Sequence, residues 1–306
     1  MEIKDAKYQI QQLKLSLINT NDESKKHQIK KEIEYLEEKV YSNLSAYDRV
    51  SIARDTLRPK ASDYINELFD DFIEFHGDRY FQDDSSIIGG IATYNGIPVT
   101  VIAQAKGNSL EENLKRNFGM TNPEGYRKAL RLAKQAEKFN RPIIALVDTA
   151  GAYPGKGAEE RGQAYAISQS LFEFISLEVP IITIVLSEGG SGGALALSVA
   201  DRIVMLENAV YSILSPEGFA SILWKDASRA KEAAEKMKLT SFDLKEKNII
   251  DYICKEPKGG AQECLELVII NLKNYLNKEL TLLKGKKTKV LLDERYQKYR
   301  NIGSNI

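Results

Sequence analysis

Two glycine-rich segments contain the residues of this sequence whose types and spacing best suit chemistry. Residues 148–157 read DTAGAYPGKG, and residues 187–194 read SEGGSGGA. Each follows an apolar run, and the second leads into small residues that suit a closely packed helix start. Glycine lets the backbone approach a ligand, and the first N–H groups of a helix have no intrahelical partner. Two such donors directed at one atom would form an oxyanion hole, which we predict for the second segment.

A tight strand-to-helix turn is the simpler explanation of either segment alone. Two such segments at successive strand ends favour binding, because ligands in parallel α/β folds lie beyond the carboxyl ends of the strands. More specific motifs fail on individual residues. Residues 189–193 match the G-x-S-x-G nucleophile elbow, but no histidine follows His76. Residues 151–156 are one residue short of a phosphate-binding loop, and Glu160 stands where a dinucleotide fingerprint needs its last glycine.

Charged residues near these segments are further candidates. Four carboxylates could act as an acid or a base: Asp148, Glu159, Glu160 and Glu188. Five basic residues could meet a phosphate or a carboxylate: Arg116, Arg127, Lys128, Lys156 and Arg161. Salt bridges, solvation and charge complementarity at helix starts are the simpler explanations of both sets.

The composition is that of an ordinary globular chain of 306 residues, with 43 Lys and Arg against 43 Asp and Glu. Because the formal charges balance, the chain has no net positive charge that would favour binding to nucleic acid or to an anionic membrane. The cysteines (Cys254, Cys264) and histidines (His27, His76) do not match a familiar four-ligand zinc pattern, so we expect no metal site. No apolar signal region and no run of about 18 apolar residues is visible. We therefore expect a cytoplasmic protein without a membrane span.

Alternating strands and helices must position the two segments. Two β-rich runs, 87–94 and 97–105, are joined by Asn95 and Gly96 and predict a hairpin. Further strands are expected at 142–148, 179–187, 202–206 and 209–214. Helices are expected from 122, at 193–200, from 215, and in long stretches after 260. Because apolar strands alternate with helices, we predict an α/β fold around a mainly parallel sheet.

The first 60 residues have a different pattern. Apolar residues at helical spacing in 1–45, interrupted by a turn at 19–22, predict a helical hairpin. A third helix is expected after Ser62, with Phe72 and Ile73 on its apolar face. Residues 58–60 fit a linker. We therefore divide the chain into a helical extension, 1–60, and an α/β domain, 61–306.

Long runs over nearly the whole chain resemble the alpha subunits of the carboxyltransferase component of acetyl-CoA carboxylase. The runs are 116–120 (RNFGM), 123–129 (PEGYRKA), 151–155 (GAYPG), 157–163 (GAEERGQ), 188–194 (EGGSGGA), 215–218 (SPEG), 220–224 (ASILW) and 295–300 (RYQKYR). The resemblance implies a crotonase-like α/β fold with an N-terminal helical hairpin and a helical C-terminal region. It also implies carboxyl transfer from carboxybiotin on the biotin carboxyl carrier protein to acetyl-CoA, which gives malonyl-CoA for fatty acid biosynthesis.

The same resemblance implies partners and site residues. Family members form α2β2 heterotetramers with a beta subunit, which holds the zinc, while the biotin carboxylase subunit uses the ATP. No cofactor is expected to be bound covalently to this chain. In the family, a glycine pair at a helix start donates N–H groups to the carbonyl oxygen of biotin, and by motif position these are Gly192 and Gly193. The rest of the biotin cavity is implied to include Gly151, Ala152, Tyr153, Gly189 and Gly190.

Several positions depart from the family pattern, including the stretch 108–110. Ala150 stands where the family usually has proline, and Gln104 and Ala105 stand where it usually has His-Gln. The sequence therefore assigns no side-chain role at this point and leaves the acyl-CoA preference open. Two other classes of function also stay open. One is a crotonase-like enzyme that acts alone, such as a hydratase with Glu188 as its carboxylate, and the other is a non-catalytic assembly subunit.

Overall fold

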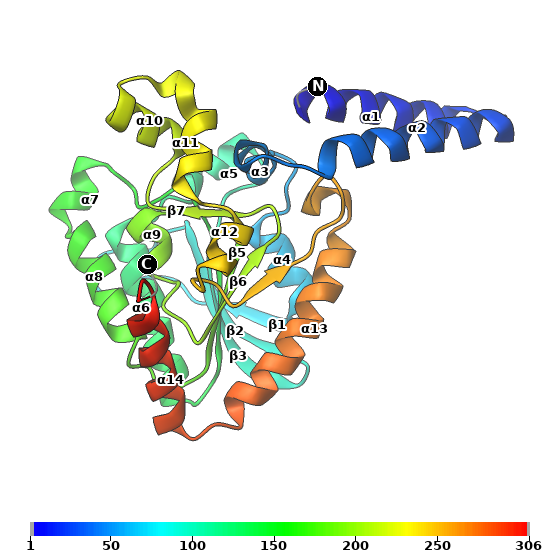
Figure 1. Ribbon diagram of the computed structural model, residues 1–306. Coiled ribbons are helices and arrows are strands. Elements are labelled where there is room, and N and C mark those ends of the chain that lie inside the picture. The colour runs from blue at the N-terminus through cyan, green and yellow to red at the C-terminus, as the bar shows by residue number, and fades with distance from the viewer. Residues whose placement is uncertain (1–2, 305–306) are drawn as a thin grey trace.

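A mixed, eight-stranded sheet runs through the centre of the computed structural model, which describes residues 3–304 (Figure 1). The strand order is β1-β2-β3-β4-β5-β6-β8, and β7 pairs with the end of β5. Strands β1 to β3 pair antiparallel, and every pairing from β3 onward is parallel. The strands are β1 Asp70–Glu74, β2 Ile87–Tyr94, β3 Ile97–Gln104, β4 Ile143–Thr149, β5 Ile181–Gly190, β6 Arg202–Leu206, β7 Val210–Ser212 and β8 Tyr252–Cys254.

Helices cover both faces of the sheet. In Figure 1, α6 and α8 lie on one side of the sheet, and α4 and α13 lie on the other. The helices are α1 Ile3–Asn19, α2 Glu23–Tyr41, α3 Ala46–Ala53, α4 Ala61–Leu68, α5 Leu110–Lys115, α6 Pro123–Lys138, α7 Lys156–Glu160, α8 Gln163–Phe174, α9 Ser191–Leu195, α10 Pro216–Trp224, α11 Ala230–Met237, α12 Ser241–Glu246, α13 Leu265–Lys284 and α14 Thr288–Asn301.

The central strands are buried on both faces, which explains their continuous apolar runs. All seven residues of β4 are buried, and in β5 only Glu188 is partly exposed. Each fully buried Val, Leu or Ile contributes about 1.5–3 kcal/mol relative to an exposed side chain. The sequence-based prediction of an α/β fold with a mainly parallel sheet is therefore confirmed. Within the described residues, no helix is long and apolar enough to cross a membrane.

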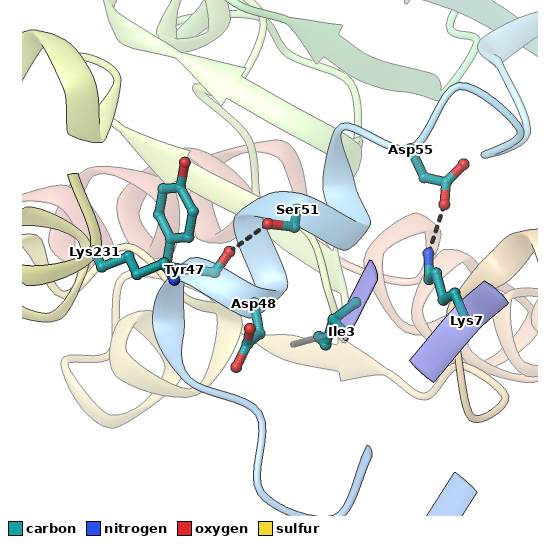
Figure 2. A pocket seen from close by; sticks show the side chains of 7 residues that line it. All are labelled: Ile3, Lys7, Tyr47, Asp48, Ser51, Asp55 and Lys231. Atoms are coloured by element: carbon teal, nitrogen blue, oxygen red, sulfur yellow. Dashed lines mark hydrogen bonds and ion pairs between the residues drawn. The ribbon is translucent and has the colours of Figure 1, made fainter. Parts of the chain in front are cut away.

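The predicted N-terminal hairpin is present as α1 and α2, which project from the body (Figure 1). Asp22 caps α2 by accepting hydrogen bonds from the N–H groups of Ser24 and Lys25. A cavity of about 350 Å³ lies where the hairpin meets α3 and α11 (Figure 2). On one side of this cavity, Lys7 of α1 forms a 2.5 Å ion pair with Asp55. The hairpin is thus held to the body partly by surface charge.

Some predicted elements have different bounds. The helix expected to include Phe72 and Ile73 ends at Leu68, and these two residues belong to β1, so that prediction is wrong. The extended backbone at Phe69 ends the helix and lets β1 pair with β2, which satisfies its backbone groups over a long sequence distance. Sequence analysis also missed α3 and β8. The helix predicted at 193–200 is the shorter α9, which begins two residues earlier.

The segment 58–60 is not an exposed linker. The Arg58 side chain is fully buried, and its Nη2 donates to the Leu186 carbonyl at 2.6 Å and to Glu256 at 2.5 Å. Just before it, α3 packs through Val50 and Ala53 into a small apolar cluster with β7 and α11. These contacts join α3 to the α/β body. The division of the chain at residue 60 stays a prediction.

Candidate functional site

Strand β5 passes directly into α9, and this junction is the second glycine segment. Ser191 has φ +53°, a left-handed conformation that reverses the chain at the first residue of the helix. Gly190, just before it, has no room for a side chain, because a Cβ would lie 2.0 Å from the Ala150 carbonyl oxygen. At Gly189 a Cβ would lie 2.6 Å from the Tyr211 ring. These two glycines are therefore required by packing between β4, β5 and β7.

The first glycine segment is held against the second. At the end of β4, the Thr149 hydroxyl accepts a hydrogen bond from Gly151 N and donates to Gly151 O. The Ala152 backbone then lies against α9, since a Cβ on Gly193 would meet Ala152 N at 2.5 Å. Beyond it, Tyr153 N donates to Thr121 O at 3.0 Å. The two predicted segments thus meet at the carboxyl ends of adjacent parallel strands.

The start of α9 offers backbone donors. No side chain caps it, and within residues 3–304 the N–H groups of Gly192 and Gly193 donate no hydrogen bond. Gly192 is partly exposed, and a Cβ there would meet nothing closer than Ile167 Cγ2 at 3.6 Å. Gly193 is buried against the first segment. Because unpaired N–H groups and the positive end of the helix dipole coincide there, the junction suits an anionic oxygen.

The remaining predicted cavity residue, Tyr153, is placed differently. Its ring covers Gly155, where a Cβ would lie 2.3 Å from Tyr153 Cε1. None of the atoms nearest to a Cβ at Gly192 or Gly193 belongs to Tyr153. The structure therefore brings Gly151, Ala152 and Gly190 to the glycine pair and leaves the Tyr153 ring on the adjoining turn.

An ion network lies beside the glycine segments, at the ends of β3, β4 and β5. Lys106 Nζ lies 2.9 Å from Asp148 and 2.8 Å from Glu188. Arg54, at the end of α3, contacts Glu188 and Glu217 at 2.8 and 2.9 Å. Burial alone would lower the Lys106 pKa, but the charges of Asp148 and Glu188 outweigh it and raise that pKa.

The same network determines the state of Glu188. Burial would raise its pKa, but the nearby charges of Lys106 and Arg54 outweigh burial and lower the pKa. Glu188 is therefore an ionised carboxylate held by two cations. That state does not favour the lone hydratase, which would need Glu188 as a free acid or base.

Two cavities border this region. One of about 400 Å³ is lined by charged and aromatic side chains, among them Arg54, Lys60, Lys106 and Phe118. The other, of about 260 Å³, begins at Gly192 and is mainly apolar, with Leu195, Tyr211, Ile213, Leu244 and Ile249 in its wall. Across the described residues, no group of three or more His, Cys, Asp or Glu is placed to hold a metal ion.

Most other charged candidates form salt bridges or hydrogen bonds elsewhere. Arg127 pairs with Asp78, and Arg161 pairs with Glu124. Lys128 is buried against Asp83 and the Ile87 carbonyl, Arg116 donates to Ser85 O, and the exposed Lys156 pairs with Glu160. Glu159 is also exposed. Salt bridges and hydrogen bonds within the fold therefore explain the residues that have these partners.

Sequence reasoning missed the roles of Arg54 and Lys106. Lys106 follows β3 directly, so its position beyond a strand end was a usable signal. Arg54 carried no such signal, because it approaches Glu188 from a helix 134 residues away in the sequence.

Comparison with known proteins identifies the family. A family model described as acetyl co-enzyme A carboxylase carboxyltransferase-like matches residues 1–303. The chain is 60% identical over 268 residues to the acetyl-coenzyme A carboxylase carboxyl transferase subunit alpha of Shouchella clausii, covering 88% of this chain and 83% of that protein. It is 60% identical over 261 residues to the Clostridium perfringens (strain ATCC 13124) subunit of the same name, covering 85% and 96%.

A protein of Natranaerobius thermophilus that is named for the beta and alpha subunits together is also similar. It is 61% identical over 263 residues, which cover 86% of this chain and 44% of that protein. The remainder of that longer protein lies outside the match.

Solved structures show the fold. A transcarboxylase 12S structure superposes with a TM-score of 0.62 at 18% identity, covering 78% of this chain and 45% of that one. The beta subunit of P. aeruginosa geranyl-CoA carboxylase gives 0.57 at 15% identity, covering 83% and 45%. The chain thus spans less than half of each, and the likeness confirms the crotonase-like fold. Together with the family match over residues 1–303 and the relatives at 60% identity, it shows that this chain belongs to the family of acetyl-CoA carboxylase carboxyltransferase alpha subunits.

Proposed function

We propose that this chain is the alpha subunit of the carboxyltransferase component of acetyl-CoA carboxylase. With a beta subunit, it transfers a carboxyl group from carboxybiotin, carried on the biotin carboxyl carrier protein, to acetyl-CoA. The product is malonyl-CoA for fatty acid biosynthesis. Family membership and the relatives at 60% identity support the reaction. The observation that carries the site is the uncapped start of α9 at Gly192 and Gly193.

The residues present fit a tethered biotin. A ureido oxygen needs hydrogen-bond donors and an open approach, and Gly192 combines an unbonded N–H group with free space around its Cα. The apolar cavity that begins at Gly192 suits the uncharged part of the ring system. The backbones of Gly151 and Ala152 lie against Gly193, and Gly189 and Gly190 allow the ends of β4, β5 and β7 to pack closely beside it.

Backbone donors provide the chemistry that this chain contributes. Carboxybiotin, when bound, supplies the carboxyl group. The N–H groups of Gly192 and Gly193 donate to the oxygen on which negative charge develops as that group leaves. Loss of one such donor typically costs about 3 kcal/mol of transition-state stabilisation. Because the donors are main-chain groups, this chain needs no histidine or cysteine at the site.

A beta subunit completes the proposed enzyme. The Natranaerobius thermophilus protein that is named for both subunits supports such a partner. We propose an α2β2 heterotetramer in the cytoplasm, in which the beta subunit holds the zinc and the donors for the thioester oxygen of acetyl-CoA. The biotin carboxylase subunit, which uses ATP, regenerates carboxybiotin on the carrier protein.

The test is malonyl-CoA formation by this chain purified with its beta subunit and supplied with carboxylated carrier protein. We expect activity from the native complex and a loss of about 100-fold or more in kcat for Gly192→Val, because the branched side chain enters the space in front of the donors. The matched control is Gly285→Val at the surface turn after α13, where a Cβ makes only ordinary contacts. Normal transfer by an assembled Gly192→Val complex would show that the site assignment is wrong.

A further inference from the structure

Gln104, the last residue of β3, is fully buried beside the glycine pair. Its side-chain Nε2 donates a hydrogen bond to the Gly193 carbonyl oxygen at 2.8 Å, across 89 residues of sequence. The bond joins the sheet to the helix that presents the proposed donors. Gln104 therefore contacts the carbonyl of a proposed donor residue, and it does not belong to the lining of the cavity that begins at Gly192.

The backbone of α9 leaves this carbonyl without its usual partner. In a longer helix, Gly193 O would accept from Leu197 N, but here Leu197 N bonds to Ala194 O at 3.1 Å instead. The helix has only five residues, and such a short helix is not stable by itself. Its orientation must therefore come from tertiary contacts, and Gln104 supplies one at the carbonyl of a proposed donor residue.

The other end of the Gln104 amide shows that packing alone does not explain this residue. Its Oε1 is buried and has no hydrogen-bond partner among the described residues. A buried polar atom without a partner costs about 1–3 kcal/mol. An apolar side chain of the same size would avoid that cost but would leave the Gly193 carbonyl without a donor, so the value of glutamine lies in its bond to Gly193.

We propose that Gln104 is a positioning residue for the oxyanion-binding start of α9. Its amide holds the peptide group that follows Gly193, and this limits how far the preceding N–H groups can turn away from a developing negative charge. Donors stabilise a transition state only when they are already oriented, and a displacement of about 1 Å can cost about 100-fold in rate. This inference rests on the proposed function of Gly192 and Gly193.

The first variant is Gln104→Met, which keeps the side-chain length and removes the donor. In the complex with the beta subunit, we expect kcat for malonyl-CoA formation to fall by about 10- to 100-fold. The KM for acetyl-CoA and the mass of the assembled complex should not change, because Gln104 does not line the cavity that begins at Gly192.

Thr183→Val is the matched control. The Thr183 hydroxyl donates to the Leu197 carbonyl at 2.8 Å, so this variant removes another buried side-chain bond to a carbonyl, four residues beyond Gly193. We expect a comparable loss in the thermal midpoint with kcat retained. If Thr183→Val lowers kcat as much as Gln104→Met does, the effect is general destabilisation and the inference is wrong.

Gln104→Glu supplies an independent readout. Its carboxyl group can donate to Gly193 O only while protonated, and when ionised it places a negative oxygen against that carbonyl. We expect its activity relative to the native complex to rise as the pH falls, because burial raises the pKa of an isolated carboxyl group. If the activity of Gln104→Glu relative to the native complex does not change with pH, this inference alone is overturned. The same holds if Gln104→Met keeps the native kcat. A native complex that makes no malonyl-CoA would overturn the proposed function and this inference with it.

Discussion

Gly192 and Gly193, neighbours at the start of α9, are glycines for different physical reasons. At Gly193 a Cβ would lie 2.5 Å from Ala152 N and 2.7 Å from Gly151 C, which are backbone atoms that cannot move independently. At Gly192 the nearest atom, Ile167 Cγ2, is at an ordinary contact distance of 3.6 Å. Packing therefore demands the second glycine, and the first leaves space that a ligand can enter.

This difference predicts unequal effects on stability. Gly193→Ala should lower the free energy of unfolding by about 1–3 kcal/mol, because the added methyl group overpacks the contact between the two glycine segments. Gly192→Ala should leave it nearly unchanged. Urea unfolding of the two variants, followed by circular dichroism, measures the difference. Equal destabilisation by both would contradict the distinction.

Lys106 should be important for stability, because it neutralises two partly or fully buried carboxylates. Lys106→Met leaves Asp148 and Glu188 beside each other without their shared cation, and breaking such a buried arrangement typically costs about 3–5 kcal/mol. The control is Lys156→Met, because the Lys156 side chain is 90% exposed and, within residues 3–304, forms an ion pair with Glu160 alone. Thermal unfolding should separate the two variants clearly, and similar midpoints would refute the role of the network.

Asp83 should contribute to the acid limit of stability. Burial would raise its pKa, but hydrogen bonds from Lys128, Gly77 N and His76 outweigh burial and lower the pKa to about 2. Since the ordinary value is higher, the unfolded chain binds the proton more readily, and this stabilisation is lost as the pH falls from about 5 toward 2. Asp83→Asn should therefore show a flatter decline of unfolding free energy between pH 5 and 3. If the decline of unfolding free energy with pH is the same in Asp83→Asn as in the native chain, Asp83 does not contribute to the acid limit.

At the scale of elements, residues close together in the sequence are enough to predict some helices, strands and turns but not others. Asn95 and Gly96 predict the turn between β2 and β3, and Asp22 caps α2, because turns and caps depend on nearby residues. Strand β1 depends instead on pairing with β2, so Phe72 was assigned to a helix. The glycine pair could be located from sequence, but the ion network could not, since Arg54 reaches it from α3.

Helix α14 contacts the body of the molecule partly through the buried guanidinium group of Arg295. Arg295 forms two hydrogen bonds with Asp201. It also donates to four carbonyls from the end of α8 to the start of β5, those of Phe174, Ile175, Leu177 and Val179. Arg295→Met should lower the free energy of unfolding by about 3–5 kcal/mol, because Asp201 would keep a buried charge without its partner. The exposed Arg300, on the same helix, gives the matched control Arg300→Met. Urea titrations that coincide for the two variants would contradict this assignment.

At the scale of the whole molecule, the N-terminal hairpin should be separable from the body. Its ion pairs with the body are Lys7 with Asp55, Lys14 with Glu263, and Glu38 with Lys258. All three are partly exposed, and such pairs are worth at most about 1 kcal/mol each. We expect a chain that begins at Ser45, the cap of α3, to unfold cooperatively with only a modestly lower midpoint. A chain without a cooperative transition would show that the hairpin is part of the folding unit.

The contacts between Arg295 and Asp201 can form only late in the synthesis of the chain, because the two residues are far apart in the sequence. Asp201 also accepts a hydrogen bond from Ile181 N at the first residue of β5, the strand that ends in the glycine turn. Protein synthesis runs toward the C-terminus, so Arg295 leaves the ribosome 94 residues after its partner Asp201. A nascent chain therefore exposes the whole glycine turn before it has the side chain that secures the base of that strand. The base of that strand can therefore be secured by this side chain only after residue 295 has been synthesised.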